Sequence, residues 1–168
     1  MNQNIGEISK KLIEYFATDV RRINHAMKVA AFAKSIGENE GLDQTELFIL
    51  EACGYLHDVG IKKGEELHQS AAGPYQEEFG PDIVRELLND TDIRPNILDR
   101  ICYIIGNHHS YQKINGIDFQ ILVEADFIVN AYEDEMNESN IRTVYERIFK
   151  TKTGRMYLEK MYFAVHFD

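Results

Sequence analysis

The chain has 168 residues, of which 44% are hydrophobic and 27% are charged, a composition typical of a globular protein. This length fits one domain with a sizeable core. The formal net charge of -10 argues against a basic face for nucleic acid, so no nucleic-acid polymer is expected as a partner. No apolar run approaches the roughly 20 residues of a membrane span, and the N-terminus lacks a signal-peptide pattern. We therefore expect a cytoplasmic protein without membrane contact.

The two cysteines, Cys53 and Cys102, lie within apolar stretches that are far apart in the sequence. Free cysteine is among the residue types most often buried in protein interiors. We therefore predict that both are reduced core residues, which fits the expected compartment.

Apolar residues recur at helical spacing through the first third of the chain. Asp19 or Thr18 is suited to cap a helix, because short polar side chains accept hydrogen bonds from the first free backbone N–H groups. Asp43 and Glu46 have the spacing of a capping box. Gly60 is the expected turn residue at the end of the third helix. The predicted helices cover residues 5–17, about 19–38 and 43–58.

Prolines and glycines set the expected boundaries in the rest of the chain. Residues 61–75 are weakly periodic and are predicted as a loop, which could extend to residue 80 as a lid over a site. Pro81 and Pro95 suit the first turns of two helices, and Asp118 is expected to cap another. Two final helical stretches are expected to break near Gly154. Without any convincing strand or repeat, the predicted fold is all-α and single-domain.

A His-Asp pair, His57-Asp58, stands at the end of the third predicted helix. An imidazole beside a carboxylate offers adjacent nitrogen and oxygen ligands, which suit Zn, Mn or Fe. One pair cannot hold a catalytic ion alone. His25 precedes Val29 by four residues and so lies on the buried face of its helix. Asp126 stands among apolar residues, where a carboxylate is costly to bury unless it is paired or bound to metal.

The ordered set of His25, His57-Asp58 and Asp126, each on a helical stretch, resembles the HD-domain superfamily of metal-dependent phosphohydrolases. The resemblance covers residues 20–130 approximately and implies a helical bundle in which these four residues bind a divalent transition metal, Fe, Mn, Zn, Co or Ni. A C-terminal helical extension, about residues 138–168, would complete a single HD-type domain over residues 1–168. Taken alone, His25 also fits a hydrogen-bonded core histidine and Asp126 a capped or salt-bridged aspartate.

Relatives with two metals carry further histidines, and His108-His109 looks like that extension; a solvated helix end is the alternative reading. The chain departs from the two-metal pattern at Gln76, where such relatives carry a histidine. One ion is therefore expected, and a second would need Glu77 or Glu78 as a substitute.

Lysine and arginine residues near the motif are candidates for binding a phosphate. Lys62 and Lys63 follow the His-Asp segment, and a lysine there could pair with a phosphate near the metal. Two exposed loop lysines are the alternative. Arg21 and Arg22 precede His25 on its helix and could serve similarly.

The resemblance implies an enzyme, a phosphohydrolase that acts on a nucleotide or other small phosphate ester through metal-activated water. Asp58 would ligate the ion and orient the water, while Lys62 would offset charge on the leaving oxygens. His108, His109 or Glu77 would hold a second ion or protonate the leaving group. The expected partner is a small phosphorylated substrate, and a homodimer is left open.

Two other classes of function stay open. A regulatory or nucleotide-binding HD module, stabilised by metal but without turnover, would use the C-terminal aromatic residues Tyr157, Tyr162 and Phe163 as a protein interface. Core packing also explains their spacing. A di-iron oxygenase would require a complete second-metal set, which Gln76 weakens. NTP-driven and serine-nucleophile chemistry lack their sequence motifs.

Overall fold

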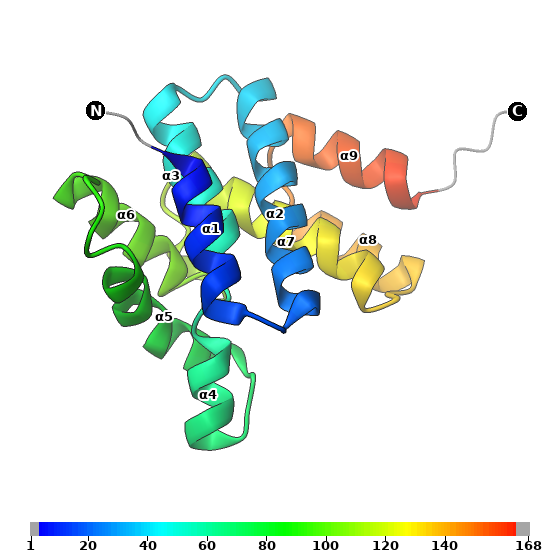
Figure 1. Ribbon diagram of the computed structural model, residues 1–168. Helices are drawn as coiled ribbons and strands as arrows, with labels where there is room; N and C mark the ends of the chain where they lie inside the picture. The colour runs from blue at the N-terminus through cyan, green and yellow to red at the C-terminus, as the bar shows by residue number, and fades with distance from the viewer. Residues whose placement is uncertain (1–3, 164–168) are drawn as a thin grey trace, which may run out of the picture.

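The computed structural model describes residues 4–163, which fold into an all-α bundle without strands in that range (Figure 1). No helix in this part of the chain combines the length and apolar character needed to cross a bilayer. In chain order the helices are α1 (Ile5–Phe16), α2 (Val20–Asn39), α3 (Gln44–Leu56), α4 (Ile61–His68), α5 (Gly73–Leu87), α6 (Pro95–Ile105), the short 3-10 helix η1 (Tyr111–Lys113), α7 (Ile117–Glu133), α8 (Glu138–Ile148) and α9 (Lys152–Tyr162).

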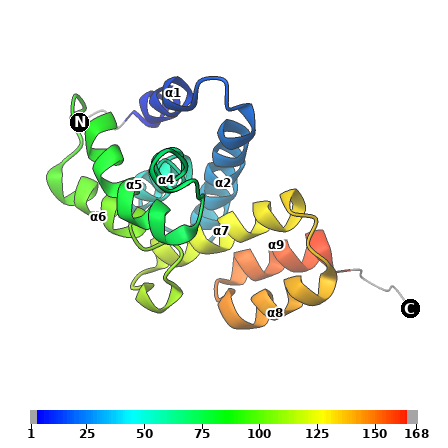
Figure 2. The same cartoon turned by 90° about the horizontal axis from the view of Figure 1, so that it is seen from below.

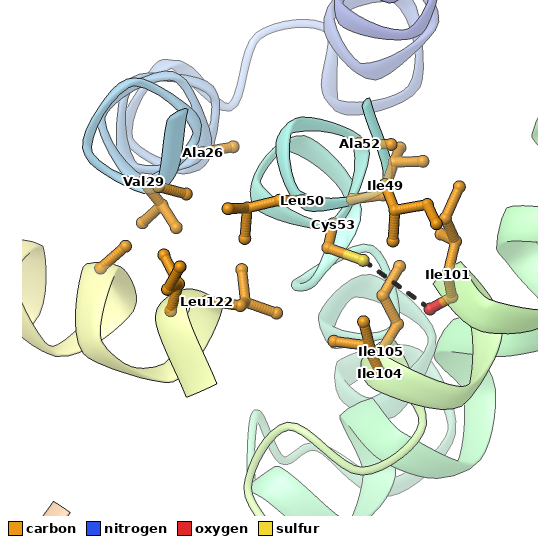
Figure 3. Packing of buried hydrophobic residues seen from close by; sticks show 14 of the residues in the cluster. Ala26, Val29, Ile49, Leu50, Ala52, Cys53, Ile101, Ile104, Ile105 and Leu122 are labelled. Atoms are coloured by element: carbon orange, nitrogen blue, oxygen red, sulfur yellow. Dashed lines mark hydrogen bonds between the residues drawn. The ribbon is translucent and has the colours of Figure 1, made fainter. Parts of the chain in front are cut away.

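Helices α2, α3 and α7 pack against one another at the centre of the bundle (Figures 1 and 2). Both α3 and α7 bury consecutive residues, which is typical of helices surrounded by protein on several sides. Each fully buried large apolar side chain contributes about 1.5–3 kcal/mol to folding. Figure 3 shows where this core converges, with Ala26 and Val29 from α2, Leu50 and Cys53 from α3, Ile101, Ile104 and Ile105 from α6, and Leu122 from α7.

Gly54 lets α2 and α3 approach closely. A Cβ atom added at Gly54 would lie 2.6 Å from Ala30 Cα and 2.9 Å from its backbone nitrogen. Because neither backbone atom can move independently of α2, only glycine permits this distance between the helices. The close approach brings His25 of α2 opposite His57 at the end of α3.

The predicted helix starts in the first part of the chain are confirmed. The Asp19 side chain accepts a hydrogen bond from the Arg22 backbone N–H at 3.2 Å. The capping box is complete, because the Asp43 side chain accepts from the Glu46 N–H and the Glu46 carboxylate accepts from the Asp43 N–H, each at 2.9 Å. Pro95 begins α6 as expected. Local capping chemistry was therefore a sound guide to these boundaries.

The prediction of a loop over residues 61–75 is wrong, because α4 occupies residues 61–68 and α5 begins at Gly73. Helix α4 buries only Ile61 and Gly64 and projects from the bundle (Figure 1). Two buried positions in a short helix give almost no hydrophobic period, so the sequence pattern missed it. An ion pair between Arg22 and Glu65, 2.5 Å long, ties α4 to α2.

Pro81 does not begin a helix as predicted, because α5 starts at Gly73 and continues through the proline. Proline is unfavourable inside a helix, because it lacks the backbone N–H that would donate to the preceding turn. Tight packing against α6 accommodates the ring: a Cβ added at Gly106 would lie 2.9 Å from Pro81 Cγ.

Two further boundary predictions are also corrected. Asp118 lies in the first turn of α7 instead of capping it, and its carboxylate binds Arg100 at 2.5 and 2.9 Å. Gly154 lies inside α9 instead of breaking it. A side chain there would overlap the buried Glu124 carboxylate, so the glycine permits close packing between α7 and α9.

The remaining predicted core residues are in place. Cys53 and Cys102 are buried, free thiols, as expected. Tyr157, Tyr162 and Phe163 pack against the core, and the Tyr162 hydroxyl donates to the Ile128 carbonyl at 2.7 Å. Core packing therefore accounts for these C-terminal aromatic residues.

Candidate metal centre

Four side chains from the three central helices meet at one point. The Nε2 atom of His25 on α2 lies 3.2 Å from His57 Nε2, 3.4 Å from Asp58 Oδ2 and 3.2 Å from Asp126 Oδ1 on α7. His57 Nε2 lies 3.4 Å and 3.5 Å from the same two carboxylate oxygens. Ligand atoms about 2.0–2.2 Å from a shared tetrahedral ion have about this spacing. The donor set therefore fits one divalent ion.

Backbone carbonyls fix the orientation of two histidine rings at the centre. The Nδ1 atoms of His57 and His108 lie 2.9 Å from the Gly54 carbonyl and 2.7 Å from the Ile105 carbonyl. Each Nδ1 must therefore carry the proton and donate it to the carbonyl, which leaves the Nε2 lone pair free as a ligand. The His108 Nε2 atom is buried and lacks a hydrogen-bond partner among residues 4–163. Such an atom indicates a missing ligand.

The orientation of the third ring, that of His25, is fixed by a carboxylate instead of a backbone carbonyl. Glu133 Oε2 lies 3.1 Å from His25 Nδ1, and Glu133 Oε1 forms an ion pair with Lys28 Nζ at 2.6 Å. Asn130 donates a hydrogen bond to Asp126 Oδ1 at 2.9 Å. The sequence analysis did not identify Asn130 or Glu133 as site residues. They lie four and seven residues after Asp126, on the same face of the helix, and this spacing was the signal that the sequence offered.

Opposite charges offset one another within the buried cluster. Burial alone would lower the pKa of His57, but the adjacent Asp58 and Asp126 carboxylates raise it to about 9. Burial alone would raise the pKa of Asp126, but the imidazoles of His57 and His25 hold it well below its usual value. The His25 pKa is raised, against burial, by its hydrogen bond to Asp126. In contrast, burial lowers the pKa of His108 to about 3, so this ring is neutral.

A second group of potential ligands shares Asp58 with the first. Asp58 Oδ1 lies 3.9 Å from His108 Nε2, and His109 offers a further ligand atom within 4.8 Å of the others. However, His109 Nε2 lies 2.8 Å from the Gln76 side-chain oxygen and donates its proton there. Gln76 thus engages one of the two ring nitrogens that His109 could offer to a second ion. A second ion remains a prediction.

Glu77 and Lys62 are placed away from the centre. The Glu77 carboxylate accepts hydrogen bonds from the His109 N–H at 3.0 Å and from the Ser110 hydroxyl at 3.1 Å, and so holds the turn after α6. The Lys62 ammonium group lies 5.3 Å from the centre of the Tyr15 ring. Neither residue lines the cavity above the four converging ligands.

This cavity has a volume of about 460 Å³ and has His25, Asp58 and Asp126 on its walls. Arg21 and Arg22 also line it, so the structure brings these predicted phosphate-binding candidates to the site. A concave site of this size is large enough for a small organic ligand beside the converging side chains.

The bundle and its buried His/Asp centre define an all-α protein that could hold a divalent metal. The sequence model of the family described as HD domain matches residues 22–150, and the chain therefore belongs to that family. A solved structure described as a predicted HD superfamily hydrolase from an uncultured Thermotogales bacterium is 23% identical to this chain. It covers 92% of this chain and 82% of its own, with a TM-score of 0.66, and so shares the fold. Comparison with curated protein sequences gave no significant match.

Proposed function

We propose that this chain is a metal-dependent phosphohydrolase that cleaves small phosphate esters, a class that includes nucleotides. The observation that carries this proposal is the convergence of His25, His57, Asp58 and Asp126 on one point, with His25, Asp58 and Asp126 also lining the cavity. A divalent ion bound there supplies a Lewis acid for a phosphoryl oxygen and lowers the pKa of water toward about 7.

Asp58 is suited to orient the attacking water. Its Oδ2 atom faces His25 and His57, while its Oδ1 atom faces His108, so one oxygen remains to accept a hydrogen bond. A water held in this way is aimed at phosphorus, which is the positioning part of the catalysis.

Other residues of the site are candidates to protonate the leaving oxygen and to offset the charge of the phosphoryl group. The pKa of His108 is lowered to about 3, and its one remaining proton lies on Nδ1, bonded to the Ile105 carbonyl, so its Nε2 atom has no proton to give near neutral pH. His109 lines the cavity and is partly exposed, so it is the better candidate to protonate a leaving oxygen. Arg21, which lines the cavity and forms no ion pair within residues 4–163, would offset the charge of the phosphoryl group.

Turnover of synthetic esters tests the proposal. The purified chain is stripped of metal, reloaded with Mn²⁺, Fe²⁺ or Zn²⁺, and assayed with p-nitrophenyl phosphate and bis-p-nitrophenyl phosphate. We expect metal-dependent hydrolysis that Asp58→Ala abolishes while the helical circular-dichroism signal persists. Asp92→Ala, at an exposed acid away from the cavity, should leave turnover unchanged. Metal binding without turnover of either ester would instead favour the regulatory module.

A further inference from the structure

Most residues that line the cavity are polar or charged, which is unusual for a site that binds a nucleotide. Of the residues that line it, only Ile61 and Ala71 are apolar, and within residues 4–163 no Phe, Tyr or Trp contributes to the lining. Small-molecule pockets are mostly lined by apolar and aromatic side chains, and unpaired bases are commonly held by stacking on aromatic rings. A nucleobase would therefore find little apolar surface here.

The charges of the lining disfavour a chain of phosphates. Five carboxylates and two guanidinium groups line the cavity, a formal excess of three negative charges, so a divalent ion leaves one negative charge uncompensated. A phosphomonoester adds about two negative charges near neutral pH. Each further phosphate would add negative charge beside these carboxylates, and like charges at close range repel more strongly near a protein surface than in bulk water.

Only one of the two arginines is free to bind an anion. Arg22 is held by Asp19 at 2.9 Å and by Glu65 at 2.5 Å. Arg21 is exposed and forms no ion pair with any residue from 4 to 163. One free guanidinium fork matches one phosphoryl group.

Two further polar side chains of the lining can accept hydrogen bonds. Asn130 donates one amide N–H to Asp126, and its side-chain oxygen has no hydrogen-bond partner within residues 4–163, so this oxygen can accept a hydrogen bond from a ligand. Asp134, one turn further along the chain, is exposed and makes no ion pair within the described part of the chain. Two acceptors in the lining are complementary to donors on the ligand, and hydroxyl groups provide them.

We propose that the substrate is a phosphomonoester of a hydroxyl-rich, non-aromatic compound of the sugar-phosphate class, an inference that rests on the proposed phosphohydrolase function. Arg21 binds the single phosphoryl group, and Asn130 and Asp134 accept hydrogen bonds from the hydroxyls. The oxygen of water forms the new bond to phosphorus, the ester P–O bond breaks, and the leaving alkoxide takes up a proton. The products are inorganic phosphate and the free polyol.

A matched set of substrates tests this inference on the metal-loaded full chain. Ribose 5-phosphate and adenosine 5′-monophosphate share the phosphorylated ribose and differ by the base, while adenosine 5′-diphosphate adds one phosphate. We expect kcat/KM to fall by about tenfold or more at each of the two additions, the effect of losing or opposing one strong polar contact. The sugar-phosphate inference would be overturned if kcat/KM for adenosine 5′-monophosphate equalled or exceeded that for ribose 5-phosphate. Cleavage of p-nitrophenyl phosphate in the same experiment would still support the phosphohydrolase function. No turnover of any ester would reject both.

Two variants separate the phosphate contact from the hydroxyl contacts. Arg21→Ala should weaken the calorimetric Kd of inorganic phosphate by about tenfold or more. Its control, Arg147→Ala, removes an exposed arginine of α8 and should not change it. Asp134→Asn should raise KM for ribose 5-phosphate, because it weakens a hydrogen bond to a hydroxyl group. It should also reduce the difference in kcat/KM between adenosine mono- and diphosphate, because it removes a negative charge from the cavity. Asp92→Asn should do neither, and equal effects from both aspartate variants would contradict the assignment of Asp134.

Discussion

At the scale of single residues, Glu133 differs from the other partners of the site imidazoles because it is a carboxylate. His57 and His108 donate to backbone carbonyls, whereas His25 donates to Glu133, which is itself held by Lys28. A carboxylate behind a ligating histidine fixes the ring and raises its basicity, and losing such a partner typically costs about 10–100-fold in metal affinity. We therefore expect Glu133→Gln to weaken the metal Kd by about this factor.

A chromogenic chelator competition measures that Kd directly, without any assay of turnover. The matched control is Glu51→Gln, because the Glu51–Lys34 and Glu133–Lys28 pairs have closely similar side-chain exposure, 13% and 46% against 15% and 45%. Glu51 also pairs with a lysine of α2 but does not line the cavity. Equal metal affinity in the two variants would show that Glu133 acts only as an ion-pair partner.

The sequence was informative at this scale where a residue's role follows from its own segment. The His-Asp pair and the ordered histidine and aspartate carry the resemblance to the HD-domain superfamily, and that resemblance predicted the four side chains that converge in the structure. Glu133 and Asn130 could not be recognised in the same way. Their spacing places them on the helical face of Asp126, but the pairing of Glu133 with His25 depends on how close α7 lies to α2, which spacing along one helix does not determine.

At the scale of helices, the contact between α2 and α3 at Gly54 positions the site, because these helices carry His25 and His57. Gly54→Ala places a methyl group against the backbone of Ala30 and forces the helices apart. We expect a loss of about 1–3 kcal/mol in the free energy of unfolding, the usual cost of overpacking. Urea denaturation measures it, and a weaker metal Kd should accompany it.

Gly6→Ala is the control for helix propensity. Gly6 is an exposed residue in the first turn of α1, and a Cβ atom there would lie 3.2 Å from the Asn4 side-chain oxygen, which is exposed and can shift, so alanine should stabilise by less than about 1 kcal/mol. The two substitutions are chemically identical and should shift stability in opposite directions. A stabilising Gly54→Ala would mean that α2 and α3 can separate without cost.

Helix boundaries were predictable where capping side chains mark them and not where tertiary contacts decide them. Asp19, Asp43 and Pro95 set their boundaries through local hydrogen bonding and backbone shape. Proline and glycine usually mark helix ends, but Pro81 and Gly154 lie inside helices. Packing of Pro81 against the end of α6 and of Gly154 against α7 outweighs their low helix propensity.

At the scale of the whole molecule, the centre links segments that are far apart in the sequence. Its candidate ligands come from α2, from the end of α3 and from α7, the three helices that form the middle of the bundle (Figure 1). An ion bound there favours the folded chain over the unfolded one, by about 2.7 kcal/mol when its free concentration is one hundred times Kd. Removing the metal should therefore lower Tm by roughly 5–10 °C for a chain of this length.

This stabilisation should also depend on pH, with a definite sign. The pKa of His57 is raised from 6.5 to about 9 in the metal-free protein, so proton binding adds stability that is present below pH 6.5 and is lost as pH rises toward about 9. A metal ligand must be deprotonated, so the ion displaces that proton, and the displacement becomes easier as pH rises. The difference in Tm between metal-loaded and chelated protein should thus grow from about pH 6.5 to about pH 8.5 at constant free metal concentration. Scanning calorimetry in metal-buffered solutions measures it, and an unchanged or shrinking difference would show that the ion does not compete with a proton on His57.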